Sequence, residues 1–451
     1  MTAAPTRLPL AQRLGYGIGD FGFNLFFTTA SLFLLFYYTD VLGLPAATAG
    51  WVFAVALIWD ALFDPVMGYV ANRTRTRWGR YRPYLLFGGL PLAASWTLMF
   101  LPVPFTGGAL VMFATATHIL FRTLYATVSM PFLALSATMT RDSHERGVLA
   151  SIRMVAATSC GLFAALFTLK LVAALGGGSI GFFWTAAVYG ALATLIFLVV
   201  FFCSVETAAD RAEASPTFGE MVRSLRGNRA FWIVCAAMLA SAFGGTLLTK
   251  TLPYYFKYAL HRPDLIGLGL AALTAAVALS MPVWMMVMKR TSKRTMWLTG
   301  AGVALVGYAL LWRAADSPTA IMLPLALIGF GVGASYLGFW AMMPDTVEYG
   351  QYKTGIRSEG GVFGVVSLIQ KTALGLAAAL LGELLSLAGY RANMDQSADT
   401  LQAMKLIMIG GAAALVSIAA IVIAFYPIDA RLHARLRKAI DRREARASAR
   451  R

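Results

Sequence analysis

The sequence predicts an all-α membrane protein with twelve transmembrane helices, and three observations lead to this prediction. First, 59% of the 451 residues are hydrophobic and only 13% are charged, whereas globular domains have about 45–50% apolar and about 25% charged residues. Second, the apolar residues form continuous stretches of the roughly 20 residues that a helix needs to cross a bilayer. Third, basic residues gather in the short connections between these stretches. We therefore expect lipid to surround much of the chain.

Twelve apolar stretches can be read along the chain in order. Backbone groups in lipid must be bonded within their own segment, which makes helices the expected structure. A β-barrel would instead need short segments of alternating polarity. The predicted spans cover about 14–41, 46–72, 83–103, 108–139, 147–175, 181–204, 229–257, 263–289, 295–314, 318–345, 361–390 and 403–427.

The positions of the charges predict the orientation of the chain. Basic residues fill the connections that follow even-numbered spans, as in the segment from Arg73 to Arg82, while the connections 42–48 and 102–110 carry no charge. Lys257 and Arg262, after the seventh span, are the main exception. Because basic loops stay in the cytoplasm, we expect both termini there. This distribution also accounts for the net charge of +17 without a nucleic-acid partner.

A polar segment divides the chain into halves that resemble each other. The sequence from Pro65 to Arg77 matches that from Pro282 to Arg294, at the end of the second helix of each half. This repeat predicts two pseudo-symmetric six-helix bundles, an architecture similar to the major facilitator superfamily, in which one half rocks against the other. The predicted domains are an N-terminal bundle, a central cytoplasmic loop, a C-terminal bundle and a basic cytoplasmic tail, over residues 1–204, 205–228, 229–427 and 428–451.

Two aspartates in the second span form a candidate cation site. Asp60 and Asp64 are four residues apart, so a helix places both carboxylates on one face, about 5–6 Å apart at Cβ. Two ionised carboxylates repel each other, and a bound cation or a shared proton would relieve the repulsion. The alternative is that Asp64 caps a helix break at Pro65 or bonds the following loop. Met281 stands at the equivalent position of the second half, so the fold itself does not require the acid.

Other polar residues within the spans suggest a central site, because an ionisable group in the membrane needs a partner, water or a function. Asp20 and Asn24 share one face of the first helix, where they serve either a cavity or the packing between helices. Arg153 begins the fifth span and Lys371 lies about ten residues inside the eleventh. Both side chains could extend to the membrane surface, but the depth of Lys371 favours a role in a cavity.

The fourth span carries a polar stripe formed by Arg122, Tyr125 and Ser129, at helical spacing. An arginine this deep should meet an acidic side chain from the first two spans. Alternatively, its guanidinium could hold an anionic group of a substrate. Neither a Ser-His-Asp arrangement nor a metal-ligand spacing is present in the sequence, and the three cysteines form no pattern, so we do not expect an enzyme.

Nearly the whole chain resembles the glycoside–pentoside–hexuronide:cation symporter family. The similarity is carried by the segments Gly15–Asn24, Tyr37–Gly43, Trp59–Gly68, Arg77–Pro83, Met130–Phe132 and Pro344–Gly350. It implies symport of a sugar by alternating access, with no cofactor beyond a coupling cation. It also implies a monomer in a lipid bilayer, and the composition favours a bacterial inner membrane.

The resemblance assigns roles to residues of this chain. Asp60 and Asp64 would take the coupling cation, as metal ligands if the ion is sodium or as a proton site. The sugar would contact residues of the first, fourth, fifth, tenth and eleventh helices, by position Asn24, Tyr125, Ser129, Arg153, Tyr336 and Lys371. Together with Asp20 and Arg122, these complete the set of residues that we expect to bind substrate.

Three departures from the melibiose-permease branch of this family change the expected substrate. That branch has acids where this chain has Asn24 and Ser129, and a small residue where it has Arg122. A fixed positive charge at Arg122 would compete with sodium. With Lys371 and Arg153 it suggests an anionic sugar, such as a uronide or a sulfonated hexose. Transport of lysolipid-like amphiphiles and a membrane sensor that binds solute without moving it are the two alternatives.

Overall fold

A computed structural model describes residues 8–140, 142–206, 218–314, 316–356 and 359–429, together with 432, 433, 435, 436, 438–440 and 442. Part of the predicted central loop and most of the predicted basic tail lie outside these residues. The described residues fold almost entirely as helices, without a β-strand. Apolar residues throughout these helices supply the burial that holds them together.

The N-terminal half contains six long helical segments. The first is built of α1 (Leu10–Gly17), α2 (Gly19–Thr29) and two π-helical turns, η1 (Ala30–Leu34) and η2 (Tyr37–Val41). The other five are α3 (Ala46–Arg73), α4 (Arg82–Met99), α5 (Gly107–Met139), α6 (Ser143–Ala174) and α7 (Gly178–Cys203).

The C-terminal half opens with a short helix, α8 (Phe218–Arg226), in the predicted central loop. Its seventh and eighth spans are α9 (Arg229–Tyr254) with the π-helical turn η3 (Tyr255–Ala259), and the 3-10 turn η4 (Pro263–Leu265) with α10 (Ile266–Arg290). The ninth to eleventh are α11 (Lys293–Ala314), α12 (Met322–Thr354) and α13 (Glu359–Leu387). The twelfth joins α14 (Ala398–Lys405), the π-helical turn η5 (Leu406–Gly411) and α15 (Ala412–Ala424).

The prediction of a twelve-helix membrane protein is confirmed. Among the described residues, ten helices are long and apolar enough to cross a membrane, and the segmented first helix and α4 complete the predicted set. Several ends differ from the predicted ones by four residues or more, and two of them have a clear physical reason. The helix α12 continues nine residues past the predicted end at 345, to Thr354, where Gly355 ends it with a left-handed φ of 75°. Hydropathy marks the edge of lipid rather than the end of a helix. The helix α4 stops at Met99, shortly before Pro102 and Pro104.

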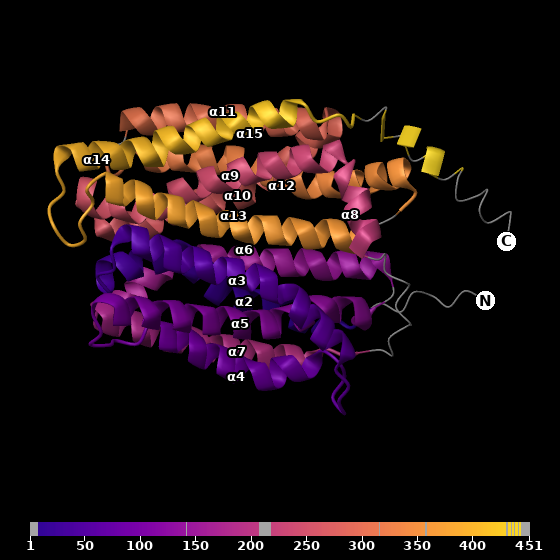
Figure 1. The fold of residues 1–451 in the computed structure, drawn as a ribbon, viewed down its shortest axis with the longest axis horizontal. Coiled ribbons are helices and arrows are strands. Elements are labelled where there is room, and N and C mark those ends of the chain that lie inside the picture. Colours follow the sequence, from indigo (N-terminus) through magenta and orange to yellow (C-terminus); the bar gives the residue numbers. More distant parts are fainter. Residues whose placement is uncertain are drawn as a thin grey trace. The chain divides into compact units, whose positions relative to one another are not determined.

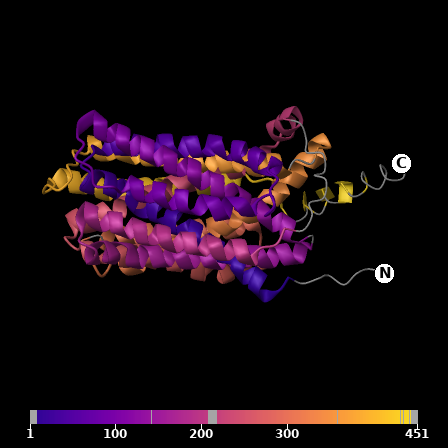
Figure 2. The ribbon, with the colours of Figure 1, turned by 90° about the horizontal axis from the view of Figure 1, so that it is seen from below.

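The chain forms two compact units whose boundaries fall inside helices. The first unit contains residues 1–211, 252–271 and 375–401, and the second contains 212–251, 272–374 and 402–451. The helices α9, α10, α13 and α14 therefore each contribute one part to each unit. Within the first unit, α4 packs on α5 and α7, α2 packs on α6 and α7, and α3 packs on α5 (Figure 1). The same helices are seen from below in Figure 2.

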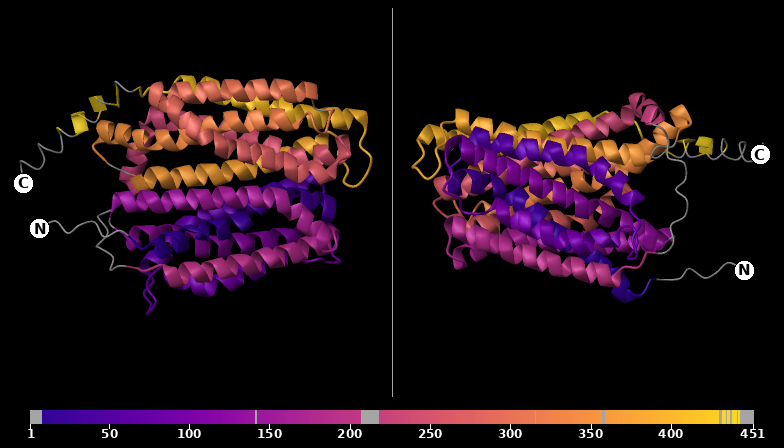
Figure 3. Two further views of the ribbon diagram at one scale, coloured as in Figure 1. Left: turned by 180° about the vertical axis from the view of Figure 1, so that it is seen from behind. Right: turned by 60° about the horizontal axis from the view of Figure 1, so that its bottom comes forward.

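The second unit has its own core. The helix α11 packs along α12 and α15, and α8 contacts α12 (Figure 3). Large side chains fill the space among α9, α11, α12 and the segment after α15, including Phe231, Trp297, Met342, Met343 and Tyr426. Near this core the Lys293 ammonium donates to both carboxylate oxygens of Asp345, at 2.8 and 2.7 Å.

A single acid fixes the basic loop of the first unit. The two carboxylate oxygens of Glu206 accept hydrogen bonds from the backbone N–H groups of Arg80, Tyr81 and Arg82, at 2.7–2.9 Å. These N–H groups lie at the start of α4, where a helix has unpaired donors and a partial positive charge that favour an anion. The contact ties the end of α7 to the loop between α3 and α4.

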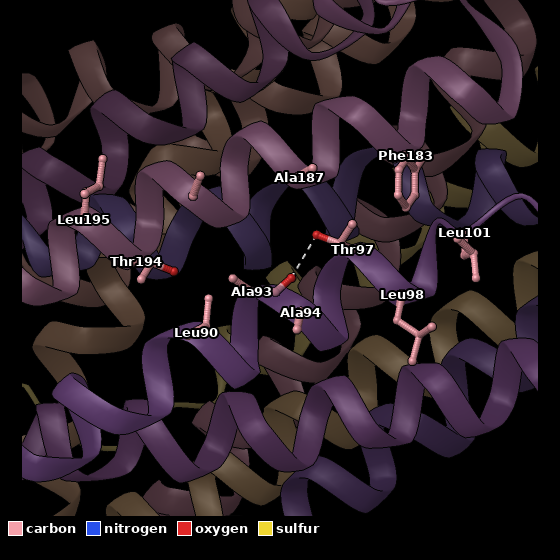
Figure 4. A pocket seen from close by; sticks show the side chains of 11 residues that line it. Leu90, Ala93, Ala94, Thr97, Leu98, Leu101, Phe183, Ala187, Thr194 and Leu195 are labelled. Atoms are coloured by element: carbon pink, nitrogen blue, oxygen red, sulfur yellow. Dashed lines mark hydrogen bonds between the residues drawn. The ribbon is translucent and has the colours of Figure 1, made fainter.

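An apolar groove runs between α4 and α7 (Figure 4). Its two threonines do not offer free hydroxyls, because Thr97 donates to the carbonyl of Ala93 and Thr194 to that of Gly190. The lining is otherwise made of alanine, leucine and phenylalanine. Such a surface suits contact with lipid rather than recognition of a polar solute.

Candidate functional site

The two aspartates of α3 lie on its buried face. Asp60 is fully buried, and Asp64, one turn further, is 8% exposed. The helix α3 runs unbroken through Pro65 to Arg73, so Asp64 does not cap a helix break. The alternative of a cap at Pro65 is therefore wrong, while a bond from Asp64 to the following loop stays a prediction. The two carboxylates therefore occupy one face of a continuous membrane-spanning helix.

Arg122 of α5 reaches the first of these acids. Its guanidinium NH1 lies 3.7 Å from Oδ2 of Asp60, and the arginine side chain is 1% exposed. The expectation that this arginine meets an acid is confirmed. Its Nε donates to Nε2 of His118, one turn earlier on α5, at 3.3 Å. The guanidinium also lies 5.8 Å from the ring centre of Phe27 and 5.6 Å from that of Phe121, within the range of cation–π attraction.

These contacts define the charge balance of the site. With both aspartates ionised, Asp60, Asp64 and Arg122 carry a combined charge of −1. A charge buried away from water is costly unless it is compensated. One proton or one monovalent cation brings the three side chains to neutrality. The arrangement is therefore suited to binding a single positive charge reversibly.

Asp20 of α2 and Arg153 of α6 form a second, closer ion pair. Arg153 Nε donates to Asp20 Oδ2 at 2.7 Å, and its NH2 donates to Oδ1 at 3.3 Å. The two side chains are 16% and 19% exposed, so the pair is partly accessible. The Arg153 guanidinium lies 5.1 Å from the ring centre of Phe132. Both residues were expected to face the substrate, and the structure shows them bonded to each other.

Asn24 is held in place by its own helix. Its side-chain Nδ2 donates to the backbone carbonyl of Asp20 at 2.8 Å, and its Oδ1 accepts from the hydroxyl of Thr28 at 3.2 Å. The amide is half-buried. Its place on the face that carries Asp20 matches the sequence prediction of a shared polar face on the first helix.

The polar stripe of α5 continues beyond Arg122. The ring of Tyr125 packs edge-on against Phe23 at a centroid distance of 5.7 Å and lies 5.8 Å from Phe121. Ser129 is buried, and within the described part of the chain its hydroxyl has no hydrogen-bond partner. Because a buried hydroxyl is normally bonded, Ser129 is a position where a solute or water would gain a contact.

The remaining two predicted residues belong to the second unit. Tyr336 of α12 is 48% exposed, and Lys371 of α13 is half-buried. The structure thus gathers the predicted residues of α2, α3, α5 and α6 in the first unit and places Tyr336 and Lys371 in the second.

Sequence reasoning missed two residues. His118 is not among the predicted residues, yet it is fully buried and accepts a hydrogen bond from Arg122; its position four residues before the arginine was the available signal. Lys250 of α9 is 5% exposed. A lysine inside an apolar run should have been recognised as a candidate functional residue.

Comparisons with known proteins agree with this architecture. Residues 15–430 match a family described as MFS/sugar transport protein. The isoprimeverose transporter of Lactiplantibacillus pentosus is 33% identical, over 94% of this chain and 89% of the relative. The glucuronide carrier protein homolog of Escherichia coli (strain K12) is 29% identical, over 96% of this chain and 95% of the relative. Among solved structures, the xylose transporter XylE of E. coli superposes with a TM-score of 0.63 at 15% identity, over 92% of this chain and 97% of that one.

Proposed function

Since this chain belongs to the MFS/sugar transport protein family, we propose that it is a cation-coupled symporter that imports a sugar or sugar derivative by alternating access. The chain is an integral membrane transporter. The proposal adds that it acts as a monomer in a bacterial inner membrane, with both termini in the cytoplasm. The basic loops after α3 and α10 support that orientation.

The observation that carries the proposal is the buried ion pair between Arg122 and Asp60. It places a fixed positive charge 3.7 Å from one of two carboxylates that share a buried helix face, where a proton or a cation would change the balance of charge. A metal ion there would need several oxygen ligands, and its charge would lie close to a fixed guanidinium. The geometry favours a proton over sodium as the coupling ion.

The substrate class depends on which positive charges are available. Arg122 and Arg153 each face an aspartate in the first unit, which weakens the argument from these two residues for an anionic sugar. A relative named a glucuronide carrier homolog supports sugar acids, and one named an isoprimeverose transporter supports neutral glycosides. We propose a glycoside or hexuronide as the substrate.

The test is uptake of a labelled panel into proteoliposomes with an imposed proton or sodium gradient. The panel contains isoprimeverose, a glucuronide and simple neutral hexosides. We expect the proton gradient to drive accumulation and Asp64→Asn to abolish it. The matched control is Asp264→Asn, which removes an exposed acid outside the site. Accumulation driven only by sodium would overturn the choice of ion, and no accumulation of any sugar under either gradient would overturn the proposed function.

The two alternatives from the sequence are not favoured. The family match extends over residues 15–430 and is to sugar transporters, and the polar set on α2, α3, α5 and α6 suits a hydroxylated solute better than a lysolipid-like amphiphile. A sensor would bind a sugar without accumulating it, so binding in detergent with no uptake in proteoliposomes would restore that alternative.

A further inference from the structure

A buried aspartate at the end of the first helix is the most completely bonded acid among the described residues. Asp40 lies in η2 and is 7% exposed. Its Oδ1 accepts from the Lys257 ammonium at 2.6 Å and from the Tyr258 hydroxyl at 2.5 Å. Its Oδ2 accepts from the Tyr390 hydroxyl at 2.5 Å and from the Thr39 hydroxyl at 2.8 Å. Four donors thus converge on one carboxylate, three of them from the C-terminal half of the chain.

The loop between α13 and α14 completes this cluster. Asn393 donates its backbone N–H to the hydroxyl of Tyr258 at 2.7 Å and its side-chain amide to the backbone carbonyl of Asp40 at 2.8 Å. Its Oδ1 accepts from Lys257 at 2.7 Å. Asn393 has a φ of 58°, a left-handed conformation that asparagine tolerates better than most residues. Burial, and then the Asp40 carboxylate, raise the pKa of Tyr390, so its hydroxyl keeps the proton that it donates.

All these residues belong to the first unit, which joins the N-terminal helices to residues 252–271 and 375–401. Beside the cluster, α3 and α13 approach closely. A Cβ added to Gly382 would lie 2.3 Å from the carbonyl oxygen of Ala46, and one added to Gly50 would lie 2.7 Å from that of Ala378. Side chains larger than hydrogen cannot fit at these glycines. At this end of the first unit, the N-terminal and C-terminal halves of the chain are therefore in close backbone contact.

The internal repeat relates Asp40 to Lys257. Asp40 and Lys257 are separated by 217 residues, the same separation that relates Pro65 to Pro282 in the repeat. The two residues are thus equivalent positions of the two halves, and they carry opposite charges. Each lies in a π-helical turn, η2 or η3, and such turns are frequent at functional sites.

We infer that Asp40 and Lys257 form a pseudo-symmetric clasp that holds one end of the transporter closed and must open in every transport cycle. Here the clasp means Asp40, Lys257, Tyr258, Tyr390 and Asn393. The inference rests on the proposed function in treating this closed end as a gate. The end in question carries the uncharged connection 42–48, opposite the basic loops, which makes it the extracytoplasmic gate of the proposed orientation.

The test measures how fast a buried position beside the clasp becomes accessible. Ala49 of α3 is fully buried. We would replace it with cysteine in a chain whose Cys160, Cys203 and Cys235 are serine, and follow alkylation by a bulky hydrophilic maleimide in detergent. This readout needs neither substrate nor gradient, so a failure of the proposed sugar uptake leaves it interpretable.

In the unmodified clasp we expect slow alkylation. Asp40→Asn and Lys257→Met should each raise the rate by about tenfold, the effect of losing a hydrogen bond to a charged group. Tyr390→Phe is the milder variant, which keeps the test valid if a charge removal impairs folding. The matched control is Asp264→Asn, which removes the nearby exposed pair of Arg262 and Asp264 and should leave the rate unchanged. Equal rates for the parent, Asp40→Asn, Lys257→Met and Tyr390→Phe would overturn the clasp.

A charge exchange tests the pseudo-symmetry itself. The single variants Asp40→Lys and Lys257→Asp place like charges together and should be alkylated fastest. The double variant Asp40→Lys/Lys257→Asp restores opposite charges at equivalent positions and should return the rate towards the parent value. If the double variant were alkylated as fast as either single variant, the ion pair between positions 40 and 257 could not be what holds this end closed.

Discussion

Asp40 and Asp60 are both buried acids of the first unit, and each faces a basic side chain, yet their surroundings differ sharply. Asp40 accepts four hydrogen bonds of 2.5–2.8 Å from side chains. The ion pair of Asp60 with Arg122 spans 3.7 Å, longer than a hydrogen bond. Asp40 is thus held by hydroxyl groups as well as by an ammonium, whereas Asp60 faces a guanidinium and has a second acid one turn away on its own helix.

The difference indicates two uses of a buried charge. A carboxylate that is fully bonded by fixed donors stabilises one conformation, and it has little capacity left for another ligand. A carboxylate that shares a helix face with a second acid lies where a bound cation would relieve the repulsion between the two. In the proposed clasp Asp40 holds the conformation, and in the proposed function Asp60 and Asp64 couple transport to the cation.

Among the variants that test this comparison, we expect the largest loss of stability from Arg122→Met. It leaves Asp60 buried without its basic partner, and breaking a buried pair from one side costs about 3–5 kcal/mol of the free energy of unfolding. Thermal unfolding in detergent would measure the loss. The double variant Asp60→Asn/Arg122→Met should recover most of this stability while remaining inactive in coupled uptake. A single variant as stable as the parent would show that the pair contributes nothing.

A smaller loss is expected from Lys257→Met at the other acid. The lysine side chain is 26% exposed, so water replaces part of its contact, and the tyrosine donors remain on Asp40. We expect about 1.5–3 kcal/mol, towards the lower figure. The same unfolding assay compares it directly with Arg122→Met. If Lys257→Met were the more damaging of the two, the ranking of the two acids would have to be reversed.

His118→Leu sharpens the comparison further, because it removes the acceptor of the Arg122 Nε hydrogen bond, together with the ring contacts of His118 to Tyr38 and Phe53. Loss of one hydrogen bond should cost about 1 kcal/mol of the free energy of unfolding. The expected signature is a weaker dependence of uptake on the proton gradient, with sugar binding kept. His118→Gln, which retains an acceptor, should be closer to the parent. Two variants with identical coupling would rule out this positioning role.

The smallest effect is expected from Asp264→Asn. The pair of Arg262 and Asp264 is 46% and 58% exposed, and ion pairs in water contribute little. We expect no measurable change in the unfolding temperature or in uptake. A clear loss in either would mean that this pair takes part in the gate and can no longer serve as its control.

The fold could be predicted from the sequence almost completely, because hydropathy over 20-residue stretches reports directly on the medium around a helix. Hydropathy did not predict the polar extension at the end of α12, because it reports on contact with lipid and not on where a helix ends. That Arg122 would meet an acid was foreseen from its depth alone, but the choice of Asp60 among Asp20, Asp60 and Asp64 was not. The pairing of Asp20 with Arg153 and the cluster on Asp40 were not, since both depend on contacts more than 130 residues apart that no local spacing encodes.

The Asp40–Lys257 pair has a consequence for the history of the chain. In a symmetric dimer of identical six-helix proteins, equivalent positions carry the same side chain and meet as like partners. An aspartate would face an aspartate there, or a lysine a lysine, and the contact would be repulsive. Opposite charges at these positions are available only to halves that have diverged. The pair is thus a mark of ancestry as a fused duplicate, and it commits each half to the other in a way that two copies of either half could not reproduce.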